Sequence, residues 1–233
     1  MSLGIDGTFT TRDGLTLRTR TWLPGGAPKA VLVISHGLGE HIGRYDQLAG
    51  VFVAQGVAVT GVDHRGHGRS EGLRGHVDGF AQFTGDLDRV LRAFRSTHGL
   101  ELPAFLYGHS MGGLIALHHN LDFPDHGLAG LILSNPLLGV AFEPPKLKVL
   151  AGRLLSRVLP RLRLGSELDA TRISRDAEEV RKYKEDPLVH GLLSTRLYTS
   201  MLAAIERVAS QPEAVLVPTL WLLGSSDYSA RLA

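Results

Sequence analysis

The chain has 233 residues, of which 43% are hydrophobic, and a formal net charge of only +2 at pH 7. This length and apolar content are enough for one domain with a sizeable core, and so small a charge excludes the strong field that nucleic-acid binding requires. The sequence contains no cysteine, which excludes disulfides, thiolate metal sites and a cysteine nucleophile.

The first predicted element is an antiparallel hairpin at a sheet edge, because two β-rich runs flank Asp13-Gly14. Four short apolar runs follow, each with the length of a buried strand, at residues 30–37, 57–66, 103–110 and 130–136. Helical patterns lie between them, at residues 45–55, 80–97 and 111–122. This alternation predicts an α/β fold with a mostly parallel sheet and helices on both faces.

The alternation stops after Pro136. Residues 137–190 contain no convincing strand, and an amphipathic helix is expected after Pro144 and Pro145. A helix at about 194–210 and a strand in "VPTLWLLGSSD" then return the chain to the sheet. We therefore expect a core segment at 1–136, a helical cap at 137–190, and a second core segment at 191–233.

The segment Gly108-His109-Ser110-Met111-Gly112 matches the pattern GxSxG between a predicted strand and a predicted helix. In this context the pattern is typical of the strained turn that exposes a nucleophilic serine, here Ser110. The alternative is an ordinary glycine-rich loop between strand and helix.

A serine nucleophile also needs backbone N–H groups that bind the oxyanion of the tetrahedral intermediate. Met111 follows Ser110 directly, and the loop "HGLGEH" at 36–41 follows an earlier strand, so we expect the donors to be Met111 and Leu38. The loop could instead be only a glycine turn.

Asp227 follows an apolar strand and is the candidate acid of the triad, although an aspartate there could simply stabilise a turn. All eleven histidines precede it, and none has the position of a general base. His64 and His67 could suggest a metal site, but no third ligand has supporting spacing, and we interpret them as structural. We expect neither metal nor cofactor.

Several stretches resemble the monoacylglycerol lipase-like α/β-hydrolases, whose members are also known as lysophospholipases or serine aminopeptidases. The most specific are "SHGLGEHIGRYDQLA", "GVDHRGHGRSEG" and "FLYGHSMGGLIAL"; "LILSNPLL", the cap sequence and "PTLWLLGSSD" extend the resemblance over nearly the whole chain. It implies a carboxylic ester hydrolase that forms an acyl-enzyme on Ser110, with Asp227 as the acid and Leu38 and Met111 as oxyanion donors. It also implies a polar substrate pocket formed by Glu40, Arg44, His109 and Tyr183.

By the same resemblance, the cap is a lid that touches membranes and admits single acyl chains. The basic amphipathic helix of the cap is typical of an interfacial segment, although its apolar stripe could equally pack on the core. The N-terminus has no signal-like run, and no stretch reaches 18 apolar residues, so we expect a cytoplasmic protein with peripheral membrane contact at most.

The sequence departs from the family pattern after Asp227, because only six residues follow it. We therefore expect the final strand and the catalytic-histidine loop to be absent, activity to be very low, and the last strand to form an apolar edge prone to self-association. The alternative function is a non-catalytic acyl-lipid binder. An epoxide hydrolase or dehalogenase is disfavoured, because those enzymes need an aspartate where Ser110 stands.

Overall fold

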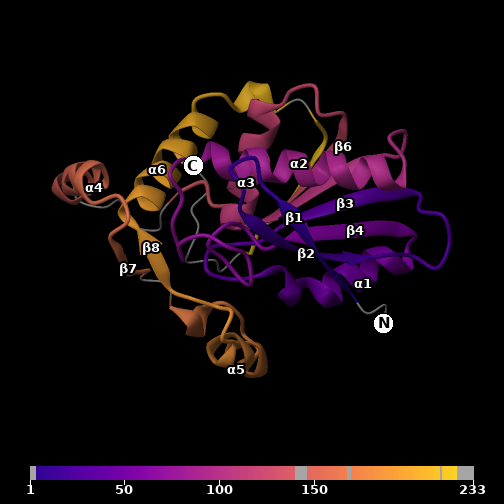
Figure 1. Ribbon diagram of the computed structural model, residues 1–233, viewed down its shortest axis with the longest axis horizontal. Coiled ribbons are helices and arrows are strands. Elements are labelled where there is room, and N and C mark those ends of the chain that lie inside the picture. Colours follow the sequence, from indigo (N-terminus) through magenta and orange to yellow (C-terminus); the bar gives the residue numbers. More distant parts are fainter. Residues whose placement is uncertain (1–3, 140–145, 167–168, 216, 225–233) are drawn as a thin grey trace.

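The computed structural model describes residues 4–139, 146–166, 169–215 and 217–224 (Figure 1). Its main sheet has seven strands in the order β1-β2-β4-β3-β5-β6-β9. The hairpin β1-β2 is antiparallel and β2 runs antiparallel to β4, whereas the remaining neighbours are parallel, so the predicted mostly parallel sheet is confirmed. The strands are β1 (Ile5–Thr10), β2 (Thr16–Trp22), β3 (Ala30–Ser35), β4 (Val57–Val62), β5 (Ala104–His109), β6 (Leu128–Ser134) and β9 (Thr219–Leu222).

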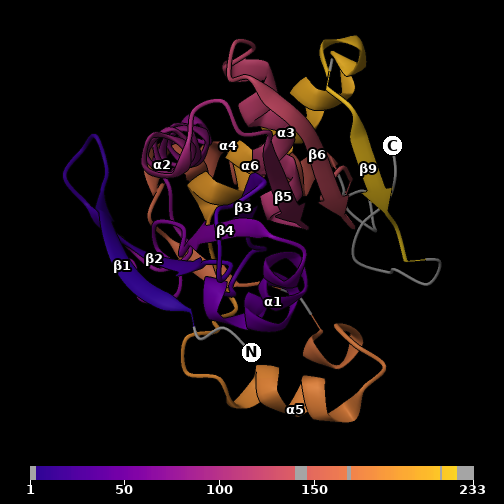
Figure 2. The ribbon, with the colours of Figure 1, turned by 90° about the vertical axis from the view of Figure 1, so that its right-hand side faces the viewer.

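Helices cover both faces of this sheet, as predicted (Figure 2). Val31 and Val33 of β3 belong to the core under α2, α3 and α6, whereas Leu32 and Ile34 belong to the core under α1. Successive strand side chains point to opposite faces, so burial of both faces requires the continuous apolar runs of the sequence. The helical elements of this core are η1 (Ile42–Tyr45), α1 (Asp46–Ala54), α2 (Ala81–His98), α3 (Met111–Asp122), α6 (Thr195–Ala209) and η3 (Pro212–Ala214).

An insertion separates β6 from α6, where the sequence predicts the cap. Figure 1 shows its helices α4 and α5 as two projections beside the sheet. α4 packs against α6, and the hydroxyls of Ser156 and Thr199 lie 2.8 Å apart at that contact. The elements are α4 (Lys146–Val158), β7 (Arg163–Gly165), η2 (Ala170–Arg172), α5 (Ala177–Glu185) and β8 (Leu192–Ser194).

The prediction that residues 137–190 contain no strand is wrong at β7. Arg163–Gly165 pairs antiparallel with Leu192–Ser194, and Leu164 stands opposite Leu193. Three residues are too few to display the two-residue alternation of a strand, and the partner lies nearly thirty residues further along the chain, so no local pattern could reveal the pair.

β9 is the outer strand next to β6 in the described sheet. Leu220, Trp221, Leu222 and Leu223 are each 42–54% exposed. The expected apolar edge is therefore present in the described structure. The described residues include no helix with both the length and the apolar character needed to cross a membrane.

Candidate active site

Ser110 lies in a sharp turn between β5 and α3, as the GxSxG pattern predicts. Its φ of 51° and ψ of −119° are unusual for a residue with a side chain. A Cβ at Gly108 would collide with Gly112 and Gly113, and one at Gly112 would overlap the carbonyl oxygen of Ser35. Only glycine fits at either position, and the turn therefore holds the serine between strand and helix in a strained conformation.

The two expected oxyanion donors lie on segments that meet at this turn. Met111 is the first residue of α3, where a backbone N–H has no acceptor within the helix. The loop that contains Leu38 lies against Ser110, because a Cβ built on Gly37 would be 3.4 Å from the Ser110 Cβ. The helix start adds a partial positive charge on the same side.

Glu40 stabilises the loop at 36–41, of which it is itself a part, through hydrogen bonds to its carboxylate. Its carboxylate accepts hydrogen bonds from the Gly37 N–H at 2.6 Å and the Tyr45 hydroxyl at 2.7 Å. The Arg44 guanidinium donates to the second oxygen at 3.1 Å. Burial opposes the charged form of Glu40, but the nearby His109 and His36 and the hydrogen bonds from Tyr45 and Gly37 outweigh this effect and lower the pKa of Glu40. Glu40 is therefore a buried carboxylate that holds the loop beside Ser110.

Arg44 connects this loop to the cap. Its guanidinium lies over the Tyr183 ring of α5, 4.7 Å from the ring centroid. Glu40, Arg44 and His109 line an open hollow of about 500 Å³. The structure thus brings together three of the four predicted substrate-binding residues around one hollow, and the fourth, Tyr183, stacks on Arg44. The hollow is also lined by Tyr45, Gln47, Leu48, Val51, Tyr107 and Ser134.

Sequence reasoning missed Ser134, the last residue of β6, and Asn135, which follows it. The His109 Nδ1–H donates to the Ser134 carbonyl at 3.1 Å, and the Ser110 N–H donates to the same carbonyl at 3.0 Å. Asn135, the next residue, has a φ of 40°. Their position at the carboxyl end of a parallel strand beside β5 was a usable signal, since ligand sites in open α/β sheets gather there.

Within the described ranges, no histidine side chain forms a hydrogen bond with the Ser110 hydroxyl. All eleven histidines lie within the described ranges, and the hydrogen bonds found there join none of them to the Ser110 hydroxyl. His36 donates to the Gly37 carbonyl at 2.8 Å, and His98 packs on Phe94. The predicted acid, Asp227, lies outside the described residues.

His64 and His67 behave as loop histidines. The His64 ring lies 3.0 Å from the Ser35 hydroxyl, and His67 donates to the Arg65 carbonyl at 3.0 Å. No group of three or more potential ligands in the described part of the chain has the arrangement of a metal site. The neighbouring Arg65 pairs with Asp13 of the β1-β2 turn and with Asp86 of α2, so this loop supports the hairpin.

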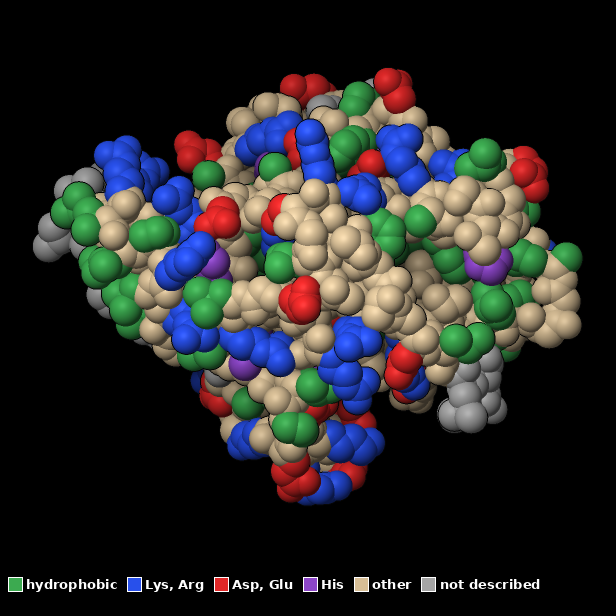
Figure 3. Space-filling view, in the orientation of Figure 1, with side chains coloured by type: hydrophobic (Ala, Val, Ile, Leu, Met, Phe, Trp, Pro, Cys, Tyr) green, Lys and Arg blue, Asp and Glu red, His purple; other side chains and the backbone are tan. Residues whose placement is uncertain are grey.

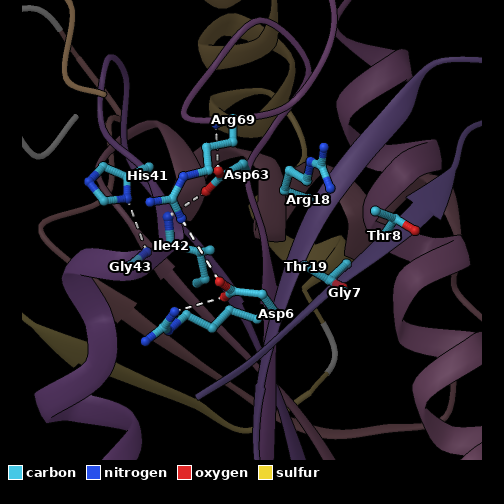
Figure 4. Close-up of a pocket in the computed structure, with 11 residues that line it drawn as sticks. Asp6, Gly7, Thr8, Arg18, Thr19, His41, Ile42, Gly43, Asp63 and Arg69 are labelled. Carbon is cyan, nitrogen blue, oxygen red and sulfur yellow. Dashed lines mark hydrogen bonds and ion pairs between the residues drawn. The ribbon is translucent and has the colours of Figure 1, made fainter. Parts of the chain in front are cut away.

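A second hollow, of about 250 Å³, lies between the β1-β2 hairpin and the loops at 41–43 and 63–69 (Figure 4). Asp6 pairs with Arg20 at 2.7 Å and with Arg69 at 4.0 Å, and the Asp63 carboxylate accepts the Ile42 and Arg69 backbone N–H groups. Neither Ser110 nor a predicted substrate-binding residue lines it.

Comparisons with known proteins agree with this geometry. Residues 26–231 match the family described as serine aminopeptidase S33. Monoglyceride lipase from Rattus norvegicus is 41% identical over 217 residues, which cover 92% of this chain and 71% of that protein. The crystal structure of Paleococcus ferrophilus monoacylglycerol lipase aligns with a TM-score of 0.80 at 31% identity, covering 97% of this chain and 79% of the other.

The fold is also that of a soluble variant of monoglyceride lipase from Saccharomyces cerevisiae, crystallised with a substrate analogue. That structure aligns with a TM-score of 0.86 over 99% of this chain and 80% of the other, at 22% identity.

Proposed function

The chain belongs to the serine aminopeptidase S33 family of α/β-hydrolases, and on that basis we propose that it carries the site of a serine carboxylic ester hydrolase for monoacylglycerols or lysophospholipid-like esters. The observation that carries the proposal is the strained turn at Ser110, with the oxyanion loop packed against it. The names of the rat and archaeal relatives support the substrate class.

In the proposed reaction, the Ser110 Oγ attacks the ester carbonyl and its proton passes to a base. The carbonyl oxygen becomes an oxyanion, which the N–H groups of Leu38 and Met111 stabilise. Collapse of this intermediate breaks the ester C–O bond, and the alcohol leaves with a proton. Water then cleaves the acyl-enzyme in the same way and frees the fatty acid. Asp227 would orient the base.

A base for the first proton transfer is needed, and the eleven histidines of the printed sequence are engaged elsewhere in the described structure. Loss of the histidine in subtilisin lowers kcat by about 10⁶-fold. We therefore expect the 233-residue polypeptide to turn over esters extremely slowly.

The head group of the substrate would occupy the hollow lined by Glu40, Arg44 and His109. The carboxylate of Glu40 and the guanidinium of Arg44 offset each other's charge, and Arg44 also stacks on Tyr183. A neutral polyol can hydrogen-bond to such a site without bringing a charge of its own. This balance favours glycerol over a phosphate-bearing head group.

Residues 137–190 would form a lid that touches lipid surfaces. In Figure 3, hydrophobic and basic side chains gather on the edge of the molecule where α4 and β7 lie. Apolar side chains there are 40–67% exposed rather than packed on the core, which favours the interfacial interpretation: Leu154, Val158, Leu159, Leu162 and Leu164. Arg153, Arg157, Arg161 and Arg163 are exposed among them. Exposed apolar groups with interspersed arginines suit an anionic lipid interface.

The exposed β9 edge supports a further proposal, that the 233-residue chain associates with itself through this strand. Unpaired backbone groups on an apolar edge strand can pair with a second copy.

An ester panel tests the function. Purified chain is incubated with glycerol monooleate and with lysophosphatidylcholine of the same acyl chain, with Ser110→Ala as the control. We expect slow release of oleate, faster from the glycerol ester and absent in the variant. Equal release by Ser110→Ala would contradict the proposal.

The alternative, a non-catalytic acyl-lipid binder, is favoured by the engagement of every histidine away from Ser110. Binding of glycerol monooleate with no Ser110-dependent release over days would support that alternative.

A further inference from the structure

Four consecutive residues, the last residue of β6 and the three that follow it, connect the nucleophile turn to the end of β9. On one side, the Ser134 carbonyl accepts the Ser110 N–H at 3.0 Å, and the Leu137 N–H donates to the Ser110 carbonyl at 2.9 Å. Pro136 lies so close to α3 that a Cβ on Gly113 would be 2.7 Å from it. The backbone of Ser110 is thus bonded to this segment on both sides.

On the other side, Asn135 holds the end of β9. Its backbone N–H donates to the Leu222 carbonyl at 2.8 Å, and its side-chain oxygen accepts the Gly224 N–H at 2.7 Å. Gly224 precedes the candidate acid, Asp227, by three positions in the sequence. Asn135 therefore fixes the path of the chain just before the acid.

The conformation of Asn135 suits this double contact. Its φ of 40° places it in the left-handed region, and among the described non-glycine residues only Ser110 shares a positive φ. Asparagine tolerates this region better than other residues with side chains, and its amide can cap nearby backbone groups. Glycine would accept the backbone but would lack the side-chain oxygen.

We propose that Asn135 is a positioning residue that couples the nucleophile turn to the end of β9. Asn135 connects two segments through hydrogen bonds: the turn that contains Ser110 and the end of β9, which leads to Asp227. It rests on the proposed function only for the roles of those two residues as nucleophile and acid.

The test compares amide hydrogen exchange, measured residue by residue by NMR, in the parent chain, Asn135→Gly and Asn135→Asp. Asn135→Gly keeps the positive φ but removes the acceptor, so exchange at Gly224 should rise about fivefold, the equivalent of one net hydrogen bond. Exchange at the Ser110 amide should also rise. The Ser110 N–H donates to the Ser134 carbonyl, and residue 135 would no longer hold that carbonyl in place through the contact with Gly224. Asn135→Asp restores an acceptor and should bring both rates back toward those of the parent.

Arg92→Ala is the matched control. It removes the ion pair between the exposed Arg92 and the buried carboxylate of Asp88 on α2, and it should change neither amide. The proposal is overturned if Asn135→Gly leaves Gly224 unchanged, or if Gly224 responds while Ser110 does not. Failure of Asn135→Asp to restore protection in a folded variant would also overturn it.

The reactivity of Ser110 distinguishes a positioning role of Asn135 from a purely local structural role. The rate at which a fluorophosphonate labels Ser110 in the presence of imidazole should fall severalfold in Asn135→Gly and recover in Asn135→Asp; an unchanged rate overturns the proposal. If the parent chain is not labelled at all, the proposed function fails, and the exchange rates still decide the role of Asn135.

Discussion

At the scale of single residues, Gly112 is the position where the nucleophile turn is most sensitive. A methyl group there would overlap the Ser35 carbonyl oxygen at the end of β3, and backbone cannot move aside as a flexible side chain can. Gly112→Ala should lower the free energy of unfolding by about 1–3 kcal/mol. Thermal unfolding measures this loss.

Gly85 provides the control, since it lies within α2 and an added Cβ there meets nothing within 4 Å. Gly85→Ala should stabilise the chain by about 0.5–1 kcal/mol through helix propensity. Equal effects of the two substitutions would contradict the close approach at Gly112.

The residues of the turn could be predicted from the sequence because their signal is local. The GxSxG pattern identifies the candidate nucleophile and both required glycines within five positions. The contact between Asn135 and Gly224 joins residues 89 positions apart, and no local sequence pattern around either residue predicts it. Tyr183 was expected from family resemblance alone, because its contact with Arg44 also depends on how the cap folds back.

At the scale of elements, the cap provides a prediction for lipid binding. Val158 and Leu162 are 67% and 40% exposed beside basic side chains. Their joint replacement by aspartate removes apolar area and adds negative charge, so binding to anionic vesicles should fall at least about tenfold. Vesicle co-sedimentation measures this.

Leu100 is a suitable control for that experiment, because it is 65% exposed but lies between α2 and β5. Leu100→Asp should leave vesicle binding unchanged. If both variants bind vesicles as the parent does, the apolar face of the cap does not contact lipid.

The two edges of the sheet provide a matched pair for self-association. Trp221 on β9 and Ile5 on β1 are both exposed apolar side chains of outer strands. Trp221→Lys should shift the chain toward monomer in sedimentation velocity, whereas Ile5→Lys should not, because a charge on the pairing edge disfavours strand addition. A parent chain that is already monomeric at high concentration would rule out association through β9.

The core elements were predictable to within a few residues, whereas in the cap the helix α4 was predicted and the strand β7 was not. β3, β4 and β5 each lie inside a predicted apolar run, and β6 begins two residues before its run, because strands buried on both faces need continuous apolar sequence. The β7 strand is three residues long and each of its residues is exposed, so burial imposes no pattern on its sequence.

At the scale of the whole molecule, buried histidines should make the fold sensitive to mild acid. Burial lowers the pKa of several of them, and that of His126 falls to about 4. The unfolded chain takes up protons at these side chains near pH 6.5 and the folded chain does not, so the free energy of unfolding falls as the pH drops from about 6.5 toward 4. The others with a lowered pKa are His36, His64, His67, His118 and His190.

The carboxylates act in a different pH window. Glu40 has a lowered pKa, so its contribution to the free energy of unfolding is lost only as the pH falls below about 4.5. The melting temperature should therefore already decline between pH 7 and pH 5. A constant melting temperature over that range would contradict the burial of the histidines.

The most direct test of the account asks whether Ser110 is the nucleophile. The chain is treated with a fluorophosphonate, with and without imidazole, and the adduct is located by intact-mass and peptide mass spectrometry. We predict a single adduct on Ser110 that forms slowly, forms faster with imidazole, and is absent in Ser110→Ala. An adduct that persists in Ser110→Ala, or no adduct even with imidazole, would contradict it.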